Sequence, residues 1–137
     1  MFKRILLPID LSNRHQKALS GAVDLARQSG GEVLLLHVIE VIAGMDREDE
    51  FYGRLERAAR KNLGQLSEQL AAKQVLSRME ILFGNRAQEI VRYAGEKNVD
   101  LVVLTAPLVR SESVSYALGS LSYKIGVFAP CPVLLVK

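Results

Sequence analysis

Acidic and polar residues follow the first apolar segment of this 137-residue chain at positions where they could contact a ligand. Asp10 and Leu11 come directly after the apolar run 5–9, and the Asp10 carboxylate could accept hydrogen bonds from a ribose or a base. The alternative is a local role, in which Asp10, Ser12 and Asn13 form a turn or cap the following helix. The residues alone leave both roles open.

A second candidate is the pair Gly119-Ser120, which lies near the start of the last predicted helix. A glycine lets an anion approach the backbone closely, the serine adds a hydroxyl, and a helix N-terminus supplies partial positive charge. The alternative is an ordinary helix start with a small residue for packing. The pair is therefore a candidate phosphate site with a purely structural alternative.

Other kinds of site find little support in the sequence. Neither GxxxxGK[ST] nor GxGxxG is present, and His15 and His37 lack neighbours at metal-ligand spacing. His37 lies in an apolar run, which favours a satisfied core or rim residue. Cys131, the only cysteine, lies between two prolines without an evident activating partner, which favours a structural thiol. We expect no catalytic residue and no protein metal site.

Strands and helices that alternate along the chain must position these residues. Continuous apolar runs predict buried parallel strands at 5–9, 33–38, 75–83, 101–105 and 133–136, the third interrupted by polar residues. Apolar residues at helical spacing predict helices around 18–26, 51–73, 87–94 and 118–127. The sequence therefore predicts the α/β class, with residues 1–137 forming one domain: a doubly wound, five-stranded parallel sheet with helices on both faces.

Composition narrows the classes of function and location. Hydrophobic residues make up 49% and charged residues 24%, with a formal net charge of +3, which is typical of a globular protein. The charges are interspersed, which argues against binding to nucleic acid or to a membrane. A single cysteine fits a reducing compartment, and no apolar run approaches the ~20 residues of a membrane span. We expect a cytoplasmic protein.

Ligands of doubly wound sheets bind beyond the carboxyl ends of the strands, where the strand order reverses. This rule selects the segments that follow each predicted strand. They are Asp10 and Leu11, Val38 to Glu40, Phe83 and Gly84, and the residues after Thr105.

The chain resembles the universal stress protein family over nearly its whole length. The resemblance is carried by residues 5–10, 36–38, 84–90, 99–103, 118–120 and 129–136, whose order and spacing together are fairly specific. It implies a Rossmann-like five-stranded parallel sheet and, commonly, a homodimer. In nucleotide-binding members it also implies ATP or another adenine nucleotide, with or without Mg²⁺.

The resemblance also implies a role for each site residue. Asp10 would hold the ribose or adenine end, the backbone of Val38 would contact adenine, and Gly119-Ser120 would close a phosphate loop of the form G-x-x-G, nine residues, G-[S/T]. The implied nucleotide-binding set is Asp10, Leu11, Val38, Leu104, Thr105, Gly119, Ser120 and Leu121.

The first two glycines of that loop are absent. Counted from the fourth predicted strand, Thr105 and Leu108 take their places, and counted back from Gly119, Ala106 and Val109 do. Pro107 has no N–H to offer, and Leu and Val add bulk where the backbone should be bare. Glu112 would repel a phosphate if it faced the pocket, whereas Arg110 and the serines at 111, 113 and 115 could supply other polar contacts. ATP binding with the family's geometry and its absence are both open.

Three functions are open on this reading. The first is a non-catalytic stress-response or regulatory protein that senses an adenine nucleotide. The second is a nucleotide-free dimeric interaction module with unidentified protein partners. The third is slow ATP hydrolysis, for which no residue that positions a water can be named. In either of the first two, an edge strand at Val133–Val136 would expose unpaired backbone groups and apolar side chains, so we expect a homodimer joined through it.

Overall fold

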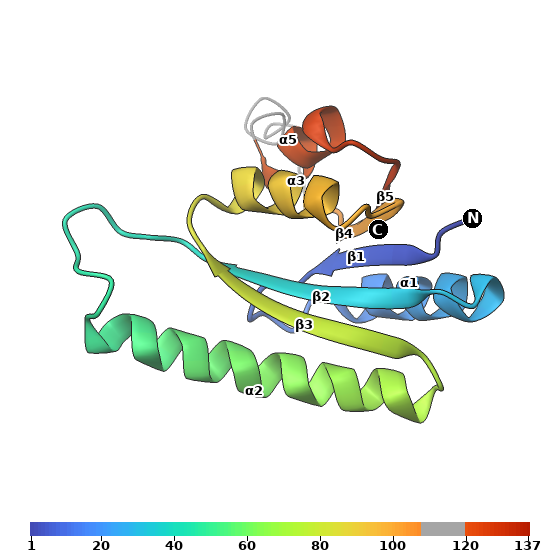
Figure 1. The fold of residues 1–137 in the computed structure, drawn as a ribbon, viewed down its shortest axis with the longest axis horizontal. Coiled ribbons are helices and arrows are strands. Elements are labelled where there is room, and N and C mark those ends of the chain that lie inside the picture. Colours follow the sequence, from blue (N-terminus) through green and yellow to red (C-terminus); the bar gives the residue numbers. More distant parts are fainter. Residues whose placement is uncertain (108–119) are drawn as a thin grey trace.

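The computed structural model describes residues 1–107 and 120–137. Within them, parallel strands form one sheet in the order β3-β2-β1-β4-β5, shown in Figure 1. The strands are β1 Arg4–Pro8, β2 Glu32–Ile39, β3 Leu76–Phe83, β4 Leu101–Thr105 and β5 Val133–Val136. The predicted α/β fold with a five-stranded parallel sheet is confirmed, and so is the position of β5 at an edge.

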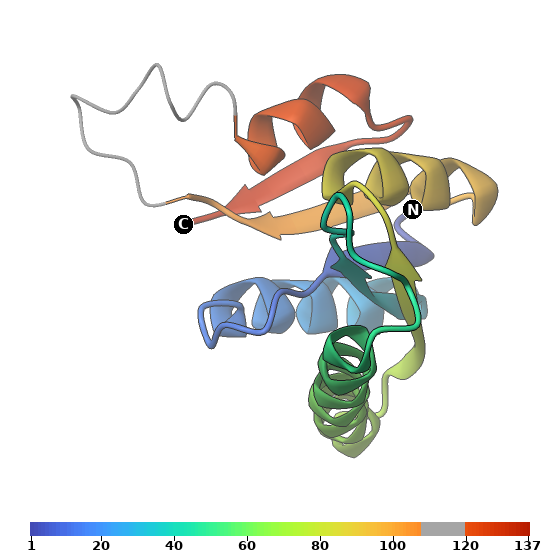
Figure 2. The same cartoon turned by 90° about the vertical axis from the view of Figure 1, so that its left-hand side faces the viewer.

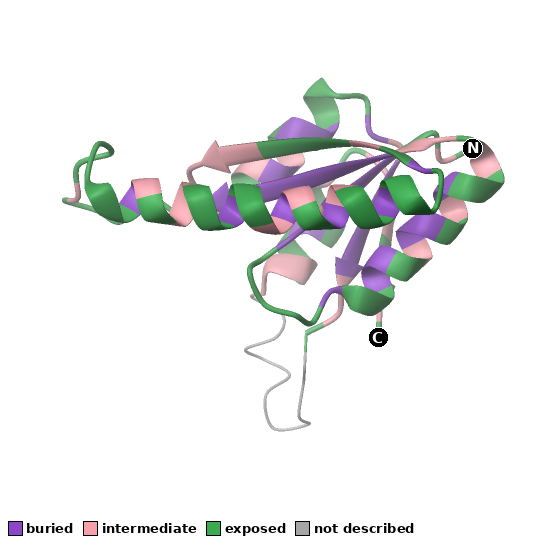
Figure 3. Ribbon diagram, turned by 90° about the horizontal axis from the view of Figure 1, so that it is seen from below, coloured by how far each residue is buried: buried purple, intermediate pink, exposed green. Residues whose placement is uncertain are grey.

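Helices cover both faces of the sheet, as Figure 2 shows. On one face lie α1 (Gln16–Ser29) and α2 (Glu50–Ala72), and on the other lie α3 (Arg86–Glu96) and α5 (Leu121–Phe128). Side chains alternate along β1, so Ile5 and Leu7 join the apolar cluster under α1 and α2, whereas Leu6 joins the cluster under α3 and α5. The buried stripes of α1 and α2 face the sheet, and their outer faces are exposed (Figure 3).

The helix starts show where local sequence rules hold and where they do not. The Asp49 side chain accepts a hydrogen bond from the N–H of Phe51 at 2.8 Å, and the Asn85 side chain accepts one from Gln88 at 3.1 Å. The predicted cap of the first helix by Ser12 or Asn13 is wrong. Helix α1 begins after His15, whose side chain makes no capping hydrogen bond, because Ser12 is engaged with Asp10 instead.

Strand β3 forms in full despite its interrupted pattern. It pairs with β2 from Glu32↔Leu76 to Ile39↔Phe83 and lies at the edge of the sheet. An edge strand needs less continuous hydrophobicity, so polar residues are tolerated on it. The last predicted helix begins at Leu121, and its expected start at 118 and 119 lies outside the described residues.

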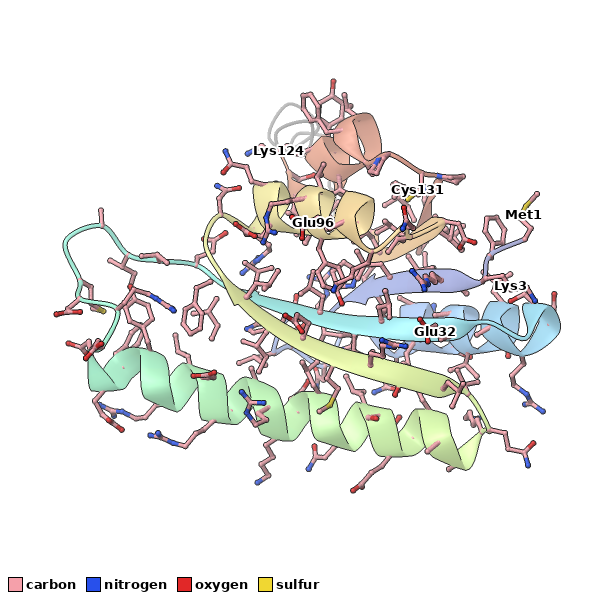
Figure 4. All side chains as sticks on the ribbon, in the orientation of Figure 1. Met1, Lys3, Glu32, Glu96, Lys124 and Cys131 are labelled. Atoms are coloured by element: carbon pink, nitrogen blue, oxygen red, sulfur yellow. The ribbon has the colours of Figure 1, made fainter. Side chains whose placement is uncertain are left out.

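An ion-pair network ties together the amino ends of three strands. Glu32 at the start of β2 lies 3.6 Å from the Arg4 guanidinium on β1 and 3.4 Å from that of Arg78 on β3. Figure 4 shows Glu32 at the end of the sheet opposite the carboxyl ends of the strands. The network therefore helps to align the three strands, and its side chains lie away from the end of the sheet where a ligand would bind.

A close backbone approach explains one of the glycines that end α1. A Cβ atom on Gly31 would lie 2.7 Å from the carbonyl oxygen of Lys3 and 2.8 Å from that of Phe2. We expect Gly31→Ala to lower the free energy of unfolding by about 1–3 kcal/mol, because the start of β1 must move. Gly64→Ala on α2, where nothing lies within 4 Å, should instead stabilise the protein by about 0.5–1 kcal/mol. Urea unfolding measures the free energy of unfolding of both variants and of wild type. A Gly31→Ala variant as stable as wild type would contradict the predicted clash.

Candidate functional site

Strands β1 and β4 part at their carboxyl ends. Their pairing stops at Leu6↔Val102, whereas β4 continues beside β5 as far as Thr105. The Ile9 N–H donates to the Leu36 carbonyl of β2. Backbone groups alternate in direction along a strand, so those of the preceding residue, Pro8, point toward β4. Proline has no N–H and therefore cannot continue the hydrogen bonds between β1 and β4. The strand order also reverses between β1 and β4. This is the switch point at which doubly wound sheets bind ligands.

A cavity of about 190 Å³ lies at this opening. The carboxyl ends of β1, β2 and β4, the starts of α3 and α5, and the turn before α1 contribute to its walls. The volume is smaller than the ~300–1,000 Å³ of typical ligand pockets, so a nucleotide would extend beyond the cavity. Most of the predicted site residues line it: Asp10, Val38, Leu104, Thr105, Ser120 and Leu121.

The remaining predicted residues lie elsewhere. Leu11 is 42% exposed and does not line the cavity, and Gly119 lies outside the described residues. Phe83 packs beneath the guanidinium of Arg47, whose Cζ atom lies 3.5 Å from the ring centroid. The substituted positions 108 and 109 and the polar residues 110–115 also fall outside the described residues.

The local role considered for Asp10 is present in the structure. Its Oδ1 atom accepts hydrogen bonds from the Ser12 N–H at 2.9 Å and from the Ser12 hydroxyl at 2.5 Å. Partial burial by itself raises the pKa of Asp10. The two Ser12 hydrogen bonds, with attraction to Arg86 and His15, outweigh burial and hold the pKa of Asp10 below its ordinary value. Asp10 is therefore a fixed carboxylate whose second oxygen, Oδ2, makes no hydrogen bond to the described residues.

The backbone of Val38 also faces this opening. The Ile39 carbonyl accepts from Gly84, which follows β3, and the Leu36 carbonyl accepts from Ile9, which follows β1. Backbone groups alternate in direction along a strand, so the N–H and C=O of Val38 point to the β1 side. Pairing between β1 and β2 ends at Pro8↔Leu36, so these two groups lie beyond the end of β1. They can receive one donor and one acceptor from a ligand.

The turn before α1 reaches across to the end of β4. The Thr105 hydroxyl donates to the carbonyl of Arg14, and the Arg14 guanidinium donates to the carbonyl of Ala106, each at 3.5 Å. At the start of α5, the Ser120 oxygen accepts from the Tyr123 N–H at 3.4 Å, so the helix-start role considered for Ser120 is also present. Its hydroxyl proton can still be donated to a ligand.

Two histidines and the cysteine have different environments. His37 is buried and its Nδ1 lies 2.6 Å from the Ile9 carbonyl, which confirms a satisfied core residue. His15 is only 7% exposed and lines the cavity, and its Nδ1 has no hydrogen-bond partner among residues 1–107 and 120–137. The pKa of Cys131 is raised, mainly by burial and then by the negative charge of Asp100. A backbone hydrogen bond from Val102 acts in the opposite direction but is outweighed. Cys131 precedes β5 at the amino ends of the strands, away from the cavity (Figure 4).

Sequence reasoning missed the three basic side chains that line the cavity: Arg14, His15 and Arg86. Arg14 and His15 belong to the turn after β1, and Arg86 is the first residue of α3. The rule that selects the carboxyl ends of strands would have found them if it had been extended to the first residues of the following helices. Of these, Arg86 and His15 attract the Asp10 carboxylate.

The part of the chain that the structure describes contains neither a candidate metal site nor a candidate membrane-spanning helix. No three His, Cys, Asp or Glu side chains of residues 1–107 and 120–137 gather where they could hold a metal ion. None of the helices described there is both long enough and apolar enough to cross a membrane.

Comparisons with known proteins agree with this fold. The model described as the universal stress protein family matches residues 1–137. Universal stress protein YxiE of Bacillus subtilis is 32% identical over 149 aligned residues that cover 100% of both chains. The structure of universal stress protein UspA from Lactobacillus plantarum has a TM-score of 0.83 at 25% identity, covering 99% of this chain and 98% of that one. An Archaeoglobus fulgidus universal stress protein in complex with dAMP has a TM-score of 0.74 at 20% identity, covering 100% of both chains.

The pKa of Asp10 predicts how this carboxylate contributes to stability. A folded-state pKa below the ordinary value of 3.8 means that the ionised group stabilises the folded protein above the unfolded-state pKa. That contribution is lost as the pH falls through the folded-state pKa. We expect wild type to be more stable than Asp10→Asn at neutral pH, and the difference to vanish in strong acid.

Thermal unfolding at several pH values measures this difference. Asp24→Asn, which removes an exposed carboxylate from α1 outside the cavity, controls for the loss of one charge. A difference between wild type and Asp10→Asn that stays constant at all pH values would refute the predicted contribution of Asp10.

Proposed function

Because the chain belongs to the universal stress protein family, we propose that it is a non-catalytic regulatory protein of the stress response that binds an adenine nucleotide. The cavity between the parted ends of β1 and β4 carries this proposal, because it gathers Asp10, the Val38 backbone and Ser120 at one place. The Archaeoglobus fulgidus protein of the same fold was solved in complex with dAMP. An adenine mononucleotide is therefore the first ligand to test.

The Val38 backbone suits adenine in particular. The Watson–Crick edge of adenine presents one acceptor, N1, and one donor, the N6 amino group. These complement the N–H and the C=O of Val38, which point beyond the end of β1. Guanine presents the reverse order, a donor at N1 and an acceptor at O6. The site should therefore select adenine over guanine without any base-specific side chain.

Asp10 and Ser120 would hold the rest of the nucleotide. Hydroxyl groups of a ribose can donate to the Oδ2 atom of Asp10, since Ser12 occupies only Oδ1. The Ser120 hydroxyl can donate to a phosphate oxygen while its own oxygen accepts from Tyr123. We assign binding, and no reaction, to this arrangement: each of these groups has a binding role, and none is placed to activate a water.

Base selectivity tests the proposal in the wild-type protein. We expect AMP to bind at least about tenfold more tightly than GMP, because the guanine edge would leave two hydrogen bonds unmade. Calorimetric titration of both nucleotides measures the ratio. Equal binding of AMP and GMP would contradict base recognition by Val38.

Side-chain variants test the same site independently. We expect Asp10→Ala and Ser120→Ala each to weaken AMP binding, with Asp24→Ala on the outer face of α1 as the control for loss of a carboxylate. Absence of any binding of AMP, ADP or ATP would instead favour the nucleotide-free interaction module.

We also propose that the protein forms a homodimer through β5. This strand lies at the edge of the sheet, and Leu134 and Leu135 are 40% and 43% exposed. Tyr123, Val127 and Phe128 on the adjoining α5 are exposed as well. Unpaired strand backbone beside exposed apolar side chains favours pairing with a second copy.

A charge on this edge should separate the dimer. We expect Leu135→Lys to be monomeric by light scattering at micromolar concentration, because two copies would bury the new charges against each other. Leu76→Lys on β3, at the opposite edge and 75% exposed, should leave the dimer intact. A monomeric wild type would refute the dimer and leave the nucleotide proposal untouched.

A further inference from the structure

One described residue after β4 offers no backbone donor to a phosphate in the cavity. Pro107 lines it and has no N–H, and the sequence contains no glycine between Thr105 and Leu118. Pro107 therefore cannot hold a phosphate through a backbone amide, as residues of glycine-rich loops do. Apart from the N–H groups at the start of α5, a phosphate in this cavity would be held by charged or polar side chains.

Arg14 is the side chain best placed to supply that charge. It lines the cavity, and its guanidinium reaches the Ala106 carbonyl at the end of β4, where β1 and β4 have parted. Among the described residues Arg14 takes part in no ion pair, whereas the other cavity arginine, Arg86, lies 3.9 Å from Glu40. The single long contact to Ala106 leaves most of the guanidinium N–H groups of Arg14 available.

His15, the next residue, is a second and independent indication of a ligand. Its side chain is more than nine-tenths buried and lines the same cavity, yet its Nδ1 has no partner among the described residues. Buried polar atoms in folded proteins are nearly always satisfied, by protein, water or ligand. An unpartnered nitrogen on a side chain that lines the cavity is therefore expected to meet a bound group.

We propose that Arg14 binds the phosphate of an adenine nucleotide through its guanidinium and that His15 Nδ1 makes a further hydrogen bond to the same nucleotide. The inference rests on the proposed function, because it assumes a nucleotide in this cavity. The inference adds side chains to the backbone N–H groups at the start of α5 as contacts of the phosphate. A guanidinium binds phosphate through two parallel hydrogen bonds, which a lysine ammonium cannot reproduce.

Comparing adenosine with AMP tests the role of Arg14. We expect Arg14→Gln to weaken AMP binding by about 10- to 100-fold, the range expected for a charge-assisted contact, and to leave adenosine binding unchanged. Arg14→Lys should recover only part of the loss. Arg54→Gln on α2, an exposed arginine away from the cavity, removes the same charge and should leave both affinities unchanged.

The outcomes separate the two proposals. If wild type binds AMP and Arg14→Gln binds it equally well, the role of Arg14 is wrong and the proposed function stands. An equal loss for AMP and adenosine also overturns the phosphate role, because adenosine has no phosphate. If wild type binds neither adenosine nor AMP, the proposed function fails and this inference fails with it.

His15→Phe tests the second contact. The substitution keeps an aromatic ring and removes both ring nitrogens, so we expect weaker AMP binding. We expect any fall in the melting temperature of the ligand-free protein to be small, because it loses only the attraction between His15 and Asp10. Unchanged AMP affinity would show that His15 does not contact the nucleotide.

Discussion

The parting of β1 from β4 is the constraint on which the rest of the site depends. Pro8 cannot donate to β4, so the ladder ends at Leu6↔Val102 while β4 continues along β5. The gap places the Asp10 turn on one side and the start of α5 on the other. Because β1 is short, β2 also extends beyond it and leaves the Val38 backbone without a neighbouring strand. Pro8 thus opens the cavity, and the short β1 exposes its hydrogen-bonding wall.

Sequence could predict the parts of the site that follow from topology. Asp10, Val38, Thr105 and Ser120 come at the carboxyl ends of strands or at the start of a helix, and a parallel sheet brings all such ends to one edge. Burial of His15 could not be predicted in this way. It depends on how the turn before α1 folds over the end of β4, through long-range contacts that no local pattern specifies.

The proposed phosphate contact of Arg14 would shift recognition of an anion from the backbone toward a side chain. Glycine loops bind phosphate with preorganised amides, which carry only partial charges and lose little entropy on binding. A guanidinium carries a full charge, but its long side chain must be ordered when the ligand binds. Arg14 is exposed and lines the same cavity as one carboxylate, Asp10, whose charge Ser12 and Arg86 stabilise. Affinity from such a contact falls with salt, as it does for any partly exposed charge pair.

The two edges of the sheet differ in a way that the sequence pattern already contains. Polar and charged residues interrupt β3, so its sequence pattern predicts a strand less clearly than the patterns of the other strands do. The same residues protect an exposed edge from pairing with another chain. The outer strand β5 is uninterrupted, Val133 to Val136, and carries no charge. An edge strand that lacks polar or charged residues is stable in solution when another segment or chain covers it. The asymmetry therefore favours association through β5 and leaves β3 as the free edge.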